Sequence, residues 1–462
     1  MTNTRSILTA LLALLSGGCV MNIAGRAEIS GLQVSPNRRF LVRSDGSPFF
    51  WLGDTGWGLL NKVNLEQAGF YLRDRKDRQF NVIQVFLTAT KWMPANVAGE
   101  APFLDDDPTR LNPKFFDHVD KVLGLAEDLG LYICLGVGEV VRPDSKWRVT
   151  VPEKAYTCGW VVGHRLRHRH NLIWNVGHDW HAVLKDVDDR PLIRAMAEGV
   201  ADGVNGAPAF DGKADYSTTL MTYHASMVSS AWFQEDAWLD FNMVQTGENP
   251  RSTVRALKKD YSLQPTKPTL LAEGGYENSN HENRPPWATP HFARFQAYVS
   301  VFAGGFGHTY GASGLWQFSK GGPGYQPWQT ALNFEGGAQM RHLRKLIESR
   351  PMLTRIPDSS LIVSITDLNS PYQPQPTRAA DGSHAFVYLP LGEPVTVALN
   401  KLSGNTVRAS WFNPRDGTEV LVGEFPSTGA RNFAPPSSGS EDDWVLVLED
   451  ATRPAPIRRG QE

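Results

Sequence analysis

Short apolar segments alternate with amphipathic segments over the first three quarters of the 462-residue chain. Several apolar segments are continuously apolar rather than alternating, which is typical of parallel strands covered on both faces. Eight such segments are predicted as strands: Phe49–Gly53, Val82–Leu87, Leu131–Val137, Leu172–Val176, Leu220–Tyr223, Phe241–Thr246, Thr269–Ala272 and Gly304–Tyr310. The amphipathic segments predict helices over Leu65–Arg78, Pro113–Leu129, Arg190–Val204, Pro250–Tyr261, Thr289–Val301 and Gly336–Ile347.

This eightfold alternation predicts an α/β fold, a (β/α)8 TIM barrel over about residues 30–350. Asn112-Pro113 and Thr289-Pro290 each place a capping residue before proline, so we expect helices to begin there. A doubly wound open sheet is the alternative. It is disfavoured because no GxGxxG motif opens a helix after a strand and no P-loop is present.

The pattern changes after Pro351, where short strand-like segments are separated by Gly, Asn, Asp and Pro and no helical period appears. The segments are Leu361–Ile365, His384–Leu389, Val395–Leu399, Val407–Phe412, Glu419–Val422 and Trp444–Leu448. They predict a small antiparallel β-sandwich over residues 352–450, packed against the barrel and contributing no catalytic carboxylate. Residues 451–462 are predicted to be a disordered tail.

Residues 1–19 have the features of a secretory signal rather than of a folded segment. Arg5 precedes the apolar run Ile7–Leu15, and small residues lead to Cys19. The segment resembles a bacterial lipoprotein signal, in which the cysteine is lipidated and tethers the protein to a membrane. We therefore expect export to the periplasm or to the outer-membrane surface of a bacterium. No other run is long and apolar enough to span a bilayer.

Composition narrows the function further. The formal net charge is −2, which argues against a nucleic-acid partner. The 14 Trp, 12 Tyr and 22 Phe suit either a large core or a site that binds the apolar faces of sugars. Beyond Cys19 there are two cysteines, Cys134 and Cys158, which we expect to be buried free thiols, with a disulfide as the alternative.

Polar and aromatic side chains follow the predicted strands, and in this fold the site lies at the C-terminal ends of the strands. Few are Lys or Arg, so a neutral polyhydroxylated substrate fits better than a phosphorylated one. The candidate substrate-binding residues are Asp54, Trp57, Trp92, His178, His224, Gln245, Tyr276, His308, Tyr310 and Trp316, and Thr90, Lys91 and Glu139 also follow strands.

Two carboxylates flanking one bond are what glycoside hydrolysis requires. Asp179 and Glu273 follow the fourth and seventh strands, which face each other across a barrel mouth. Asp179 has an alternative reading as the N-cap of the next helix. Glu139 is the strongest competing carboxylate. Glu248 and Glu277 lie further beyond their strands, where a solvated or supporting position is expected.

Metal and cofactor chemistry is not predicted. Five histidines crowd residues 164–181, and His164 and His168 have a spacing compatible with a zinc site. There is no HExxH motif, however, and the stretch around Arg165–His170 is typical of a solvated basic helix end. Gly311–Leu315 is not a GxSxG nucleophile elbow, which disfavours serine hydrolysis.

Five segments together resemble the apiosidase-like glycoside hydrolases of family 140. They are Phe49–Trp57, Asn171–Asp179, Trp238–Thr246, Leu270–Glu277 and Gly307–Gly311, in order along the barrel. The stretch Trp411–Gly417 is similar to the β-domain that usually follows this barrel and carries a collagen-binding label. The resemblance implies that Asp179 is the acid/base and Glu273 the nucleophile.

One residue departs from the family pattern, which usually has glycine where this chain has His178. A charged His178 would favour the ionised form of the neighbouring Asp179 and would shift the pH profile. The functional hypotheses are a retaining glycosidase acting on a plant or microbial polysaccharide, a non-catalytic carbohydrate-binding or adhesion protein, and a metal-dependent hydrolase.

Overall fold

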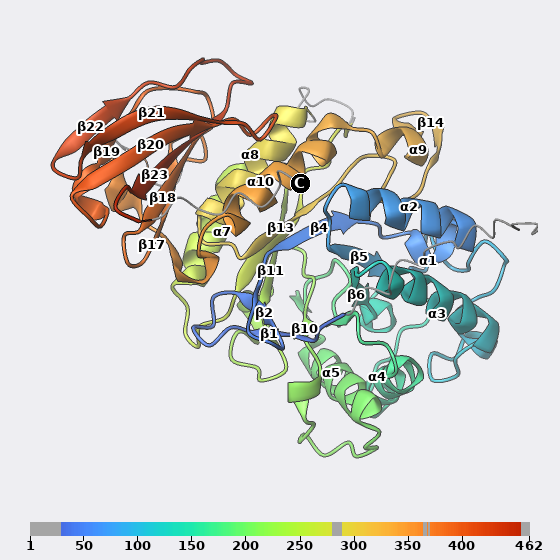
Figure 1. Cartoon of the computed structure of the whole chain (residues 1–462). Coiled ribbons are helices and arrows are strands. Elements are labelled where there is room, and N and C mark those ends of the chain that lie inside the picture. Colours follow the sequence, from blue (N-terminus) through green and yellow to red (C-terminus); the bar gives the residue numbers. More distant parts are fainter. Residues whose placement is uncertain (1–28, 280–288, 364–366, 368–369, 454–462) are drawn as a thin grey trace, which may run out of the picture.

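A parallel eight-stranded sheet forms the centre of the computed structural model, which describes residues 29–279, 289–363, 367 and 370–453 (Figure 1). Its hydrogen-bonded order is β10-β7-β6-β5-β4-β13-β12-β11, so sequence neighbours are also neighbours in the sheet, and the first strand, β4, pairs with the last, β13. The strands are β4 (Trp51–Thr55), β5 (Val82–Phe86), β6 (Tyr132–Gly136), β7 (Leu172–Asn175), β10 (Met221–Thr222), β11 (Asn242–Gly247), β12 (Thr269–Gly274) and β13 (Gly307–Tyr310).

Strands β10 and β11 meet through the residues that precede β11. The Asp240 backbone N–H donates to the Met221 carbonyl oxygen (2.9 Å), and the Asp240 carboxylate accepts the Met221 N–H (2.7 Å). Thr222 Oγ1 donates to the Phe241 carbonyl oxygen at 2.8 Å. These bonds bring the two ends of the sheet together. The TIM-barrel prediction is therefore confirmed, and the doubly wound alternative is wrong because the strand order never reverses.

Helices cover the outside of the barrel, and several of them begin at a residue whose side chain caps the helix. Asn112 and Thr289 each precede the proline that begins a helix, and the side chain of each accepts a hydrogen bond from a backbone N–H of the first turn, as predicted. Asn249 does the same. The helices are α1 (Leu59–Lys62), α2 (Leu65–Asp77), α3 (Pro113–Asp128), α4 (Pro152–Leu166), α5 (Arg190–Asn205), α6 (Ser230–Phe233), α7 (Pro250–Tyr261), α8 (Pro290–Phe302), α9 (Trp328–Ala331) and α10 (Glu335–Glu348).

Helix α4 was not predicted, and its glycines explain why. Glycine lowers helix propensity, so Gly159 and Gly163 weaken the helical signal of the segment. In the structure these two residues let the backbone of α4 pack directly on α5. A Cβ at Gly159 would lie 2.3 Å from the Met196 carbonyl oxygen, and one at Gly163 would lie 2.5 Å from that of Val200.

The C-terminal domain is a two-layered antiparallel β structure beside α8 and α10 (Figure 1). A six-stranded sheet has the order β16-β17-β18-β23-β20-β21, and a two-stranded sheet pairs β19 with β22. Side chains of both sheets share one buried apolar cluster. The strands are β16 (Arg355–Pro357), β17 (Gln375–Ala379), β18 (His384–Leu389), β19 (Val395–Ala398), β20 (Thr406–Phe412), β21 (Glu419–Pro426), β22 (Ala430–Phe433) and β23 (Trp444–Asp450).

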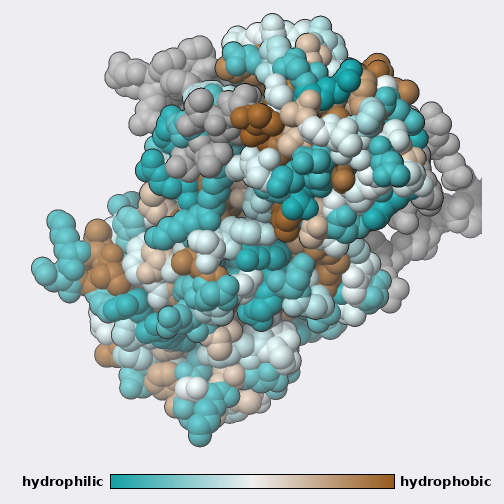
Figure 2. Space-filling model, turned by 90° about the vertical axis from the view of Figure 1, so that its left-hand side faces the viewer, coloured by the Kyte–Doolittle hydropathy of each residue, from teal (hydrophilic) through white to brown (hydrophobic). Residues whose placement is uncertain are grey.

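Helix α8 lies between the barrel and this domain, which explains why every residue from Phe292 to Phe302 is buried. Arg294 of α8 forms a buried ion pair with Asp443 (2.8 Å), and Tyr298 stacks on Tyr388 with ring centroids 4.9 Å apart. The apolar core of the barrel continues into the domain at Phe386. The prediction that the domain packs against the barrel is thus confirmed. Figure 2 shows the molecule from the side of the C-terminal domain, where the surface is largely hydrophilic with small apolar patches.

Smaller elements complete the described chain. The short strands are β1 (Leu32–Val34), β2 (Leu41–Arg43), β3 (Pro48–Phe49), β8 (Val183–Leu184), β9 (Val187–Asp188), β14 (Lys320–Gly322) and β15 (Tyr325–Pro327). Single 3-10 turns lie at Leu104–Asp106, Gly138–Val141, Tyr216–Thr218, Met352–Thr354, Ser359–Leu361 and Leu399–Lys401. The predicted signal, residues 1–19 with Cys19, and residues 454–462 of the predicted tail lie outside the described residues. Among the described helices, none is long and apolar enough to cross a bilayer.

Candidate active site

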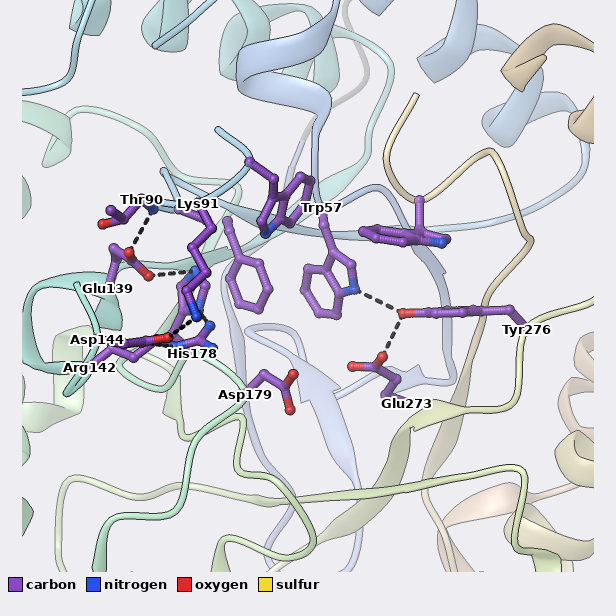
Figure 3. A pocket seen from close by; sticks show the side chains of 14 residues that line it. Trp57, Thr90, Lys91, Glu139, Arg142, Asp144, His178, Asp179, Glu273 and Tyr276 are labelled. Carbon is purple, nitrogen blue, oxygen red and sulfur yellow. Dashed lines mark hydrogen bonds and ion pairs between the residues drawn. The ribbon is translucent and has the colours of Figure 1, made fainter. Parts of the chain in front are cut away.

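A cavity of about 320 Å³ lies at the C-terminal ends of the barrel strands (Figure 3). Both predicted catalytic carboxylates line it, and no residue of the C-terminal domain does. The lining residues are Trp57, Phe86, Ala89, Thr90, Lys91, Trp92, Glu139, Arg142, Asp144, His178, Asp179, Glu273, Tyr276 and Trp316. The predicted site residues therefore include seven that meet in one place: Trp57, Trp92, His178, Asp179, Glu273, Tyr276 and Trp316.

Glu273, near the end of β12, is held by neighbouring side chains. The Tyr276 hydroxyl donates to Glu273 Oε1 at 2.6 Å, and Trp57 Nε1 in turn donates to the Tyr276 oxygen at 3.0 Å. His224 Nε2 lies 3.2 Å from the other carboxylate oxygen. Burial and the adjacent Glu273 charge raise the pKa of Tyr276 well above its usual value, so the phenol stays protonated and donates.

The position of Tyr276 depends on a glycine in the neighbouring loop. A Cβ at Gly311, the residue after β13, would lie 1.9 Å from the Tyr276 ring. The backbone there passes directly against the phenol that holds Glu273. The Tyr276 ring also stacks with Trp316, with centroids 6.1 Å apart. Gly311 is therefore required by packing around the site.

Asp179, beyond the end of β7, has different surroundings. Its backbone N–H donates to the His224 carbonyl oxygen (3.2 Å), and its φ of 48° lies in the left-handed region. Among the described residues, no side chain donates a hydrogen bond to its carboxyl group. The next helix, α5, begins eleven residues later with Asp189 at its N-cap position. Asp179 is therefore not a helix cap, and its carboxyl group points across the cavity toward Glu273 (Figure 3).

The third carboxylate of the cavity, Glu139, lies among protein groups rather than opposite Glu273. Glu139 Oε1 accepts the Thr90 N–H at 2.7 Å, and Oε2 lies 3.4 Å from His178 Nε2. Its side chain is 4% exposed. Glu139 thus joins the loops that follow β5, β6 and β7. This position disfavours Glu139 as the catalytic competitor of Asp179.

His178 does not carry the charge that would perturb Asp179. Burial, more than any other influence, lowers the pKa of His178 below its usual value, and the nearby Arg142 lowers it further while Glu139 opposes this. The imidazole is therefore neutral at neutral pH. From the sequence, a charged His178 would favour the ionised form of Asp179. That effect is absent at neutral pH because the ring is uncharged.

Three predicted substrate-binding residues are wrong, because their side chains point into the helix layer. Asp54 accepts a hydrogen bond from Tyr71 of α2 (2.6 Å) and is fully buried. His308 Nδ1 lies 3.4 Å from Ser300 Oγ of α8, and burial lowers the pKa of His308 to about 3. The Tyr310 hydroxyl donates to Glu277, whose carboxylate also accepts two N–H groups at the start of α10.

Two further predicted residues are not among those that line the cavity. His224 contacts Glu273 and the edge of the Trp57 ring, but it does not line the cavity. Gln245 pairs in register with Glu273 and does not line it either. We regard both as supporting residues rather than as direct contacts of a substrate.

Sequence reasoning missed four lining residues: Phe86, Ala89, Arg142 and Asp144. Phe86 is the last residue of β5, where it resembles an ordinary core residue. Arg142 and Asp144 lie in the loop well beyond β6, where no periodic signal exists. Asp144 pairs with both cations of the cavity, Arg142 at 2.7 Å and Lys91 at 2.6 Å.

Other chemistry finds little support in the described part of the chain. No three His, Cys, Asp or Glu side chains there gather as metal ligands. Cys134 and Cys158 are buried free thiols, as predicted, and burial raises the pKa of Cys158 to about 12. Neither thiol has the exposed, electropositive setting of a reactive cysteine.

Comparisons with known proteins identify the family of both domains. The profile described as "Apiosidase-like, catalytic domain" matches residues 35–354. The chain belongs to the apiosidase-like family. The profile described as "Putative collagen-binding domain of a collagenase" matches residues 356–449. No curated protein matches the sequence.

Solved structures similar to this apiosidase-like protein extend over both domains. A glycoside hydrolase is 30% identical, with 92% of this chain and 98% of that chain covered and a TM-score of 0.82. A family 5 glycoside hydrolase from Bacteroides vulgatus is 27% identical, with 93% and 95% covered and a TM-score of 0.81. A family 27 β-L-arabinopyranosidase from Geobacillus stearothermophilus, 10% identical over 87% and 97%, has a TM-score of 0.52 and shares the fold alone. Fold and family are those of glycoside hydrolases.

Proposed function

We propose that the protein is a retaining glycosidase in which Glu273 is the nucleophile and Asp179 the acid/base. The proposal rests on a difference in hydrogen bonding: a described side chain donates to the carboxyl group of Glu273, and none donates to that of Asp179. Glu273 accepts a hydrogen bond from the Tyr276 hydroxyl, and a donor of this kind stabilises the charge of a nucleophilic carboxylate. Asp179 accepts no hydrogen bond from a described side chain, so its carboxyl group is available to the glycosidic oxygen of a substrate.

The reaction proceeds in two steps with these roles. The Glu273 carboxylate attacks the anomeric carbon while the glycosidic bond breaks, and Asp179 gives its proton to the departing oxygen. In the second step Asp179 takes a proton from water, whose oxygen attacks the same carbon and releases Glu273. The Tyr276 hydroxyl holds the carboxylate in position before each attack.

The substrate class follows from the rest of the cavity and from the family. Trp92 and Trp316, with ring centroids 5.3 Å apart, offer apolar surface for a sugar ring. Lys91 and Arg142 are the lining cations, and both are paired with Asp144. We therefore propose a glycosidic bond in a plant or microbial polysaccharide as the substrate, with apiosidase-like specificity as the first to test.

A panel of aryl glycosides and polysaccharides tests the proposal. We expect hydrolysis of at least one glycoside, with NMR showing that the first-formed sugar keeps the anomeric configuration of the substrate. Inversion of configuration would contradict the retaining mechanism. Glycan binding without any hydrolysis would favour a non-catalytic carbohydrate-binding protein instead.

The separation of the two carboxyl groups provides a structural criterion. Retention requires about 5–5.5 Å between them, whereas inversion requires about 6.5–9.5 Å to admit a water molecule. We expect the shorter separation between Asp179 and Glu273 in a crystal structure with a bound glycan. A separation in the longer range would contradict the two-step mechanism.

We further propose that the protein is exported and tethered through a lipid on Cys19. The support is the sequence of residues 1–19. Mass spectrometry of the N-terminal peptide from the membrane fraction should find a lipidated cysteine, and Cys19→Ala should release the protein from that fraction. Retention of Cys19→Ala in the membrane would contradict the tether.

A further inference from the structure

Three stacked rings form one wall of the cavity and reach from the nucleophile to the acid. Trp57 stacks on Phe86 with ring centroids 4.2 Å apart and an interplanar angle of 10°. Phe86 stacks on His178 with centroids 3.9 Å apart and an angle of 21°. Trp57 is bonded through Tyr276 to Glu273, whereas His178 directly precedes Asp179. His178 is thus the last ring of this wall.

The contacts of His178 define its tautomer. Nε2 lies 3.1 Å from the Thr88 carbonyl oxygen, which can only accept, so Nε2 carries the hydrogen. Nδ1 lies 3.4 Å from Arg142 Nη1, which can only donate, so Nδ1 accepts. The ring is therefore neutral and fixed on both edges. Its side chain is 2% exposed, so it does not move freely into solvent.

His178 lies on the side of the cavity that would receive the leaving group. The acid must reach the departing oxygen, whereas the nucleophile must reach the anomeric carbon of the sugar that stays behind. Figure 3 shows His178 and Arg142 on the side of Asp179 away from Glu273. A leaving group bonded to the oxygen beside Asp179 would therefore meet His178 and the Arg142 guanidinium.

We propose that His178 determines which leaving groups this apiosidase-like protein accepts, by closing the cavity beyond Asp179 with a rigid neutral ring. Packing on Phe86 and the two ring contacts leave the imidazole no room to retreat. The ring also presents the acceptor that helps hold Arg142 at this end of the cavity. The inference rests on the proposed function, because it takes Asp179 as the acid.

Two aryl glycosides of one sugar test the proposal. The 4-nitrophenyl and 4-methylumbelliferyl leaving groups are similar in acidity but differ in size, so the ratio of their kcat/KM values reports the space beyond Asp179. We expect His178→Gly to raise the ratio of 4-methylumbelliferyl to 4-nitrophenyl kcat/KM by about tenfold. His178→Asn, smaller than histidine but still able to hydrogen-bond, should raise it less and serves if the glycine variant does not fold.

Two control variants separate this role from a structural one. His178→Gln keeps a donor for Thr88, an acceptor for Arg142 and similar bulk, so its ratio should stay within about twofold of the wild type. His181→Ala removes a histidine of the same loop that packs against Trp232 and does not line the cavity. Its ratio should not change.

The outcomes distinguish this inference from the proposed function. A wild-type protein that hydrolyses neither aryl glycosides nor glycans contradicts the glycosidase assignment, and with it a leaving-group subsite. Active wild type together with an unchanged ratio in folded His178→Gly and His178→Asn contradicts the role of His178 alone. A ratio that rises equally in His181→Ala would also contradict it.

Discussion

The two ends of the catalytic cavity are built differently. At one end Glu273 accepts a hydrogen bond from Tyr276, has His224 Nε2 at 3.2 Å, and is supported through Tyr276 by Trp57. At the other end, Asp179 receives no side-chain hydrogen bond from the described residues, and the polar groups near it bond to one another instead. Glu139, His178, Arg142 and Asp144 form that second set of contacts.

In the mechanism proposed above, this difference prepares the two carboxyl groups for opposite tasks. Hydrogen bonds to a carboxylate stabilise its charge, as a nucleophile requires. A carboxyl group without donors is easier to keep protonated, as a general acid requires. The sequence places both groups after strands, and the proposed roles rest on their neighbours.

Replacing the nucleophile should have the largest effect. Glu273→Gln keeps the shape and the contact with Tyr276 but cannot attack, so we expect kcat to fall by roughly 10⁴-fold or more on every glycoside. Glu248→Gln, which changes a nearby carboxylate outside the cavity, is the matched control. If Glu273→Gln kept about a tenth of the wild-type activity, Glu273 would not be the nucleophile.

Replacing the acid should give a loss that depends on the leaving group. For Asp179→Ala we expect kcat/KM to fall by about 10²–10⁴-fold on glycans, and much less on 4-nitrophenyl glycosides, which need little acid assistance. Added azide should restore turnover and give a glycosyl azide of retained configuration. Full activity of Asp179→Ala on a natural glycan would show that the acid lies elsewhere.

Removing the donor from the nucleophile should have an intermediate effect. Tyr276→Phe keeps the ring against Gly311 but loses the hydrogen bond to Glu273. A hydrogen bond to a charged group contributes about 1.5–3 kcal/mol, so we expect kcat to fall by about 10–100-fold with KM little changed. Steady-state kinetics measure this. An unchanged kcat would mean that the unequal support of the two carboxyl groups has no catalytic consequence.

The smallest effect concerns pH. Burial lowers the pKa of His178, so the ring is neutral at neutral and alkaline pH. His178→Gln should therefore leave the alkaline limb of the pH profile within about 0.2 units of the wild type. An upward shift of that limb would show that His178 is charged in the active enzyme.

The barrel could be predicted from the sequence because its strands are short, apolar runs buried on both faces, such as Val82–Leu87. The structure has this strand at Val82–Phe86. Helix α4 could not be predicted, because Gly159 and Gly163 lower its helical signal. These glycines are needed only because the backbone of α5 packs directly against them. Tertiary packing overrides propensity at such positions.

The site was predicted only in part, because the sequence analysis did not consider which way each side chain points from its strand. A residue at the C-terminal end of a strand lies level with the active site, but its side chain can point outward to the helices instead of into the cavity. Trp51 and Thr309 bond to each other inside the barrel, so Asp54 and His308, at odd spacing from them, face outward. Strand parity could have excluded these residues. Arg142 and Asp144 carry no such signal, because loop geometry brings them to the cavity.

Chemical labelling of the nucleophile tests the central claim most directly. An activated 2-deoxy-2-fluoro glycoside of the sugar that the enzyme hydrolyses should form a stable glycosyl-enzyme, since the fluorine slows its breakdown. Peptide mapping by mass spectrometry should then find one sugar attached to Glu273, and none in the Glu273→Gln variant. Attachment to Asp179 or Glu139 would contradict the account.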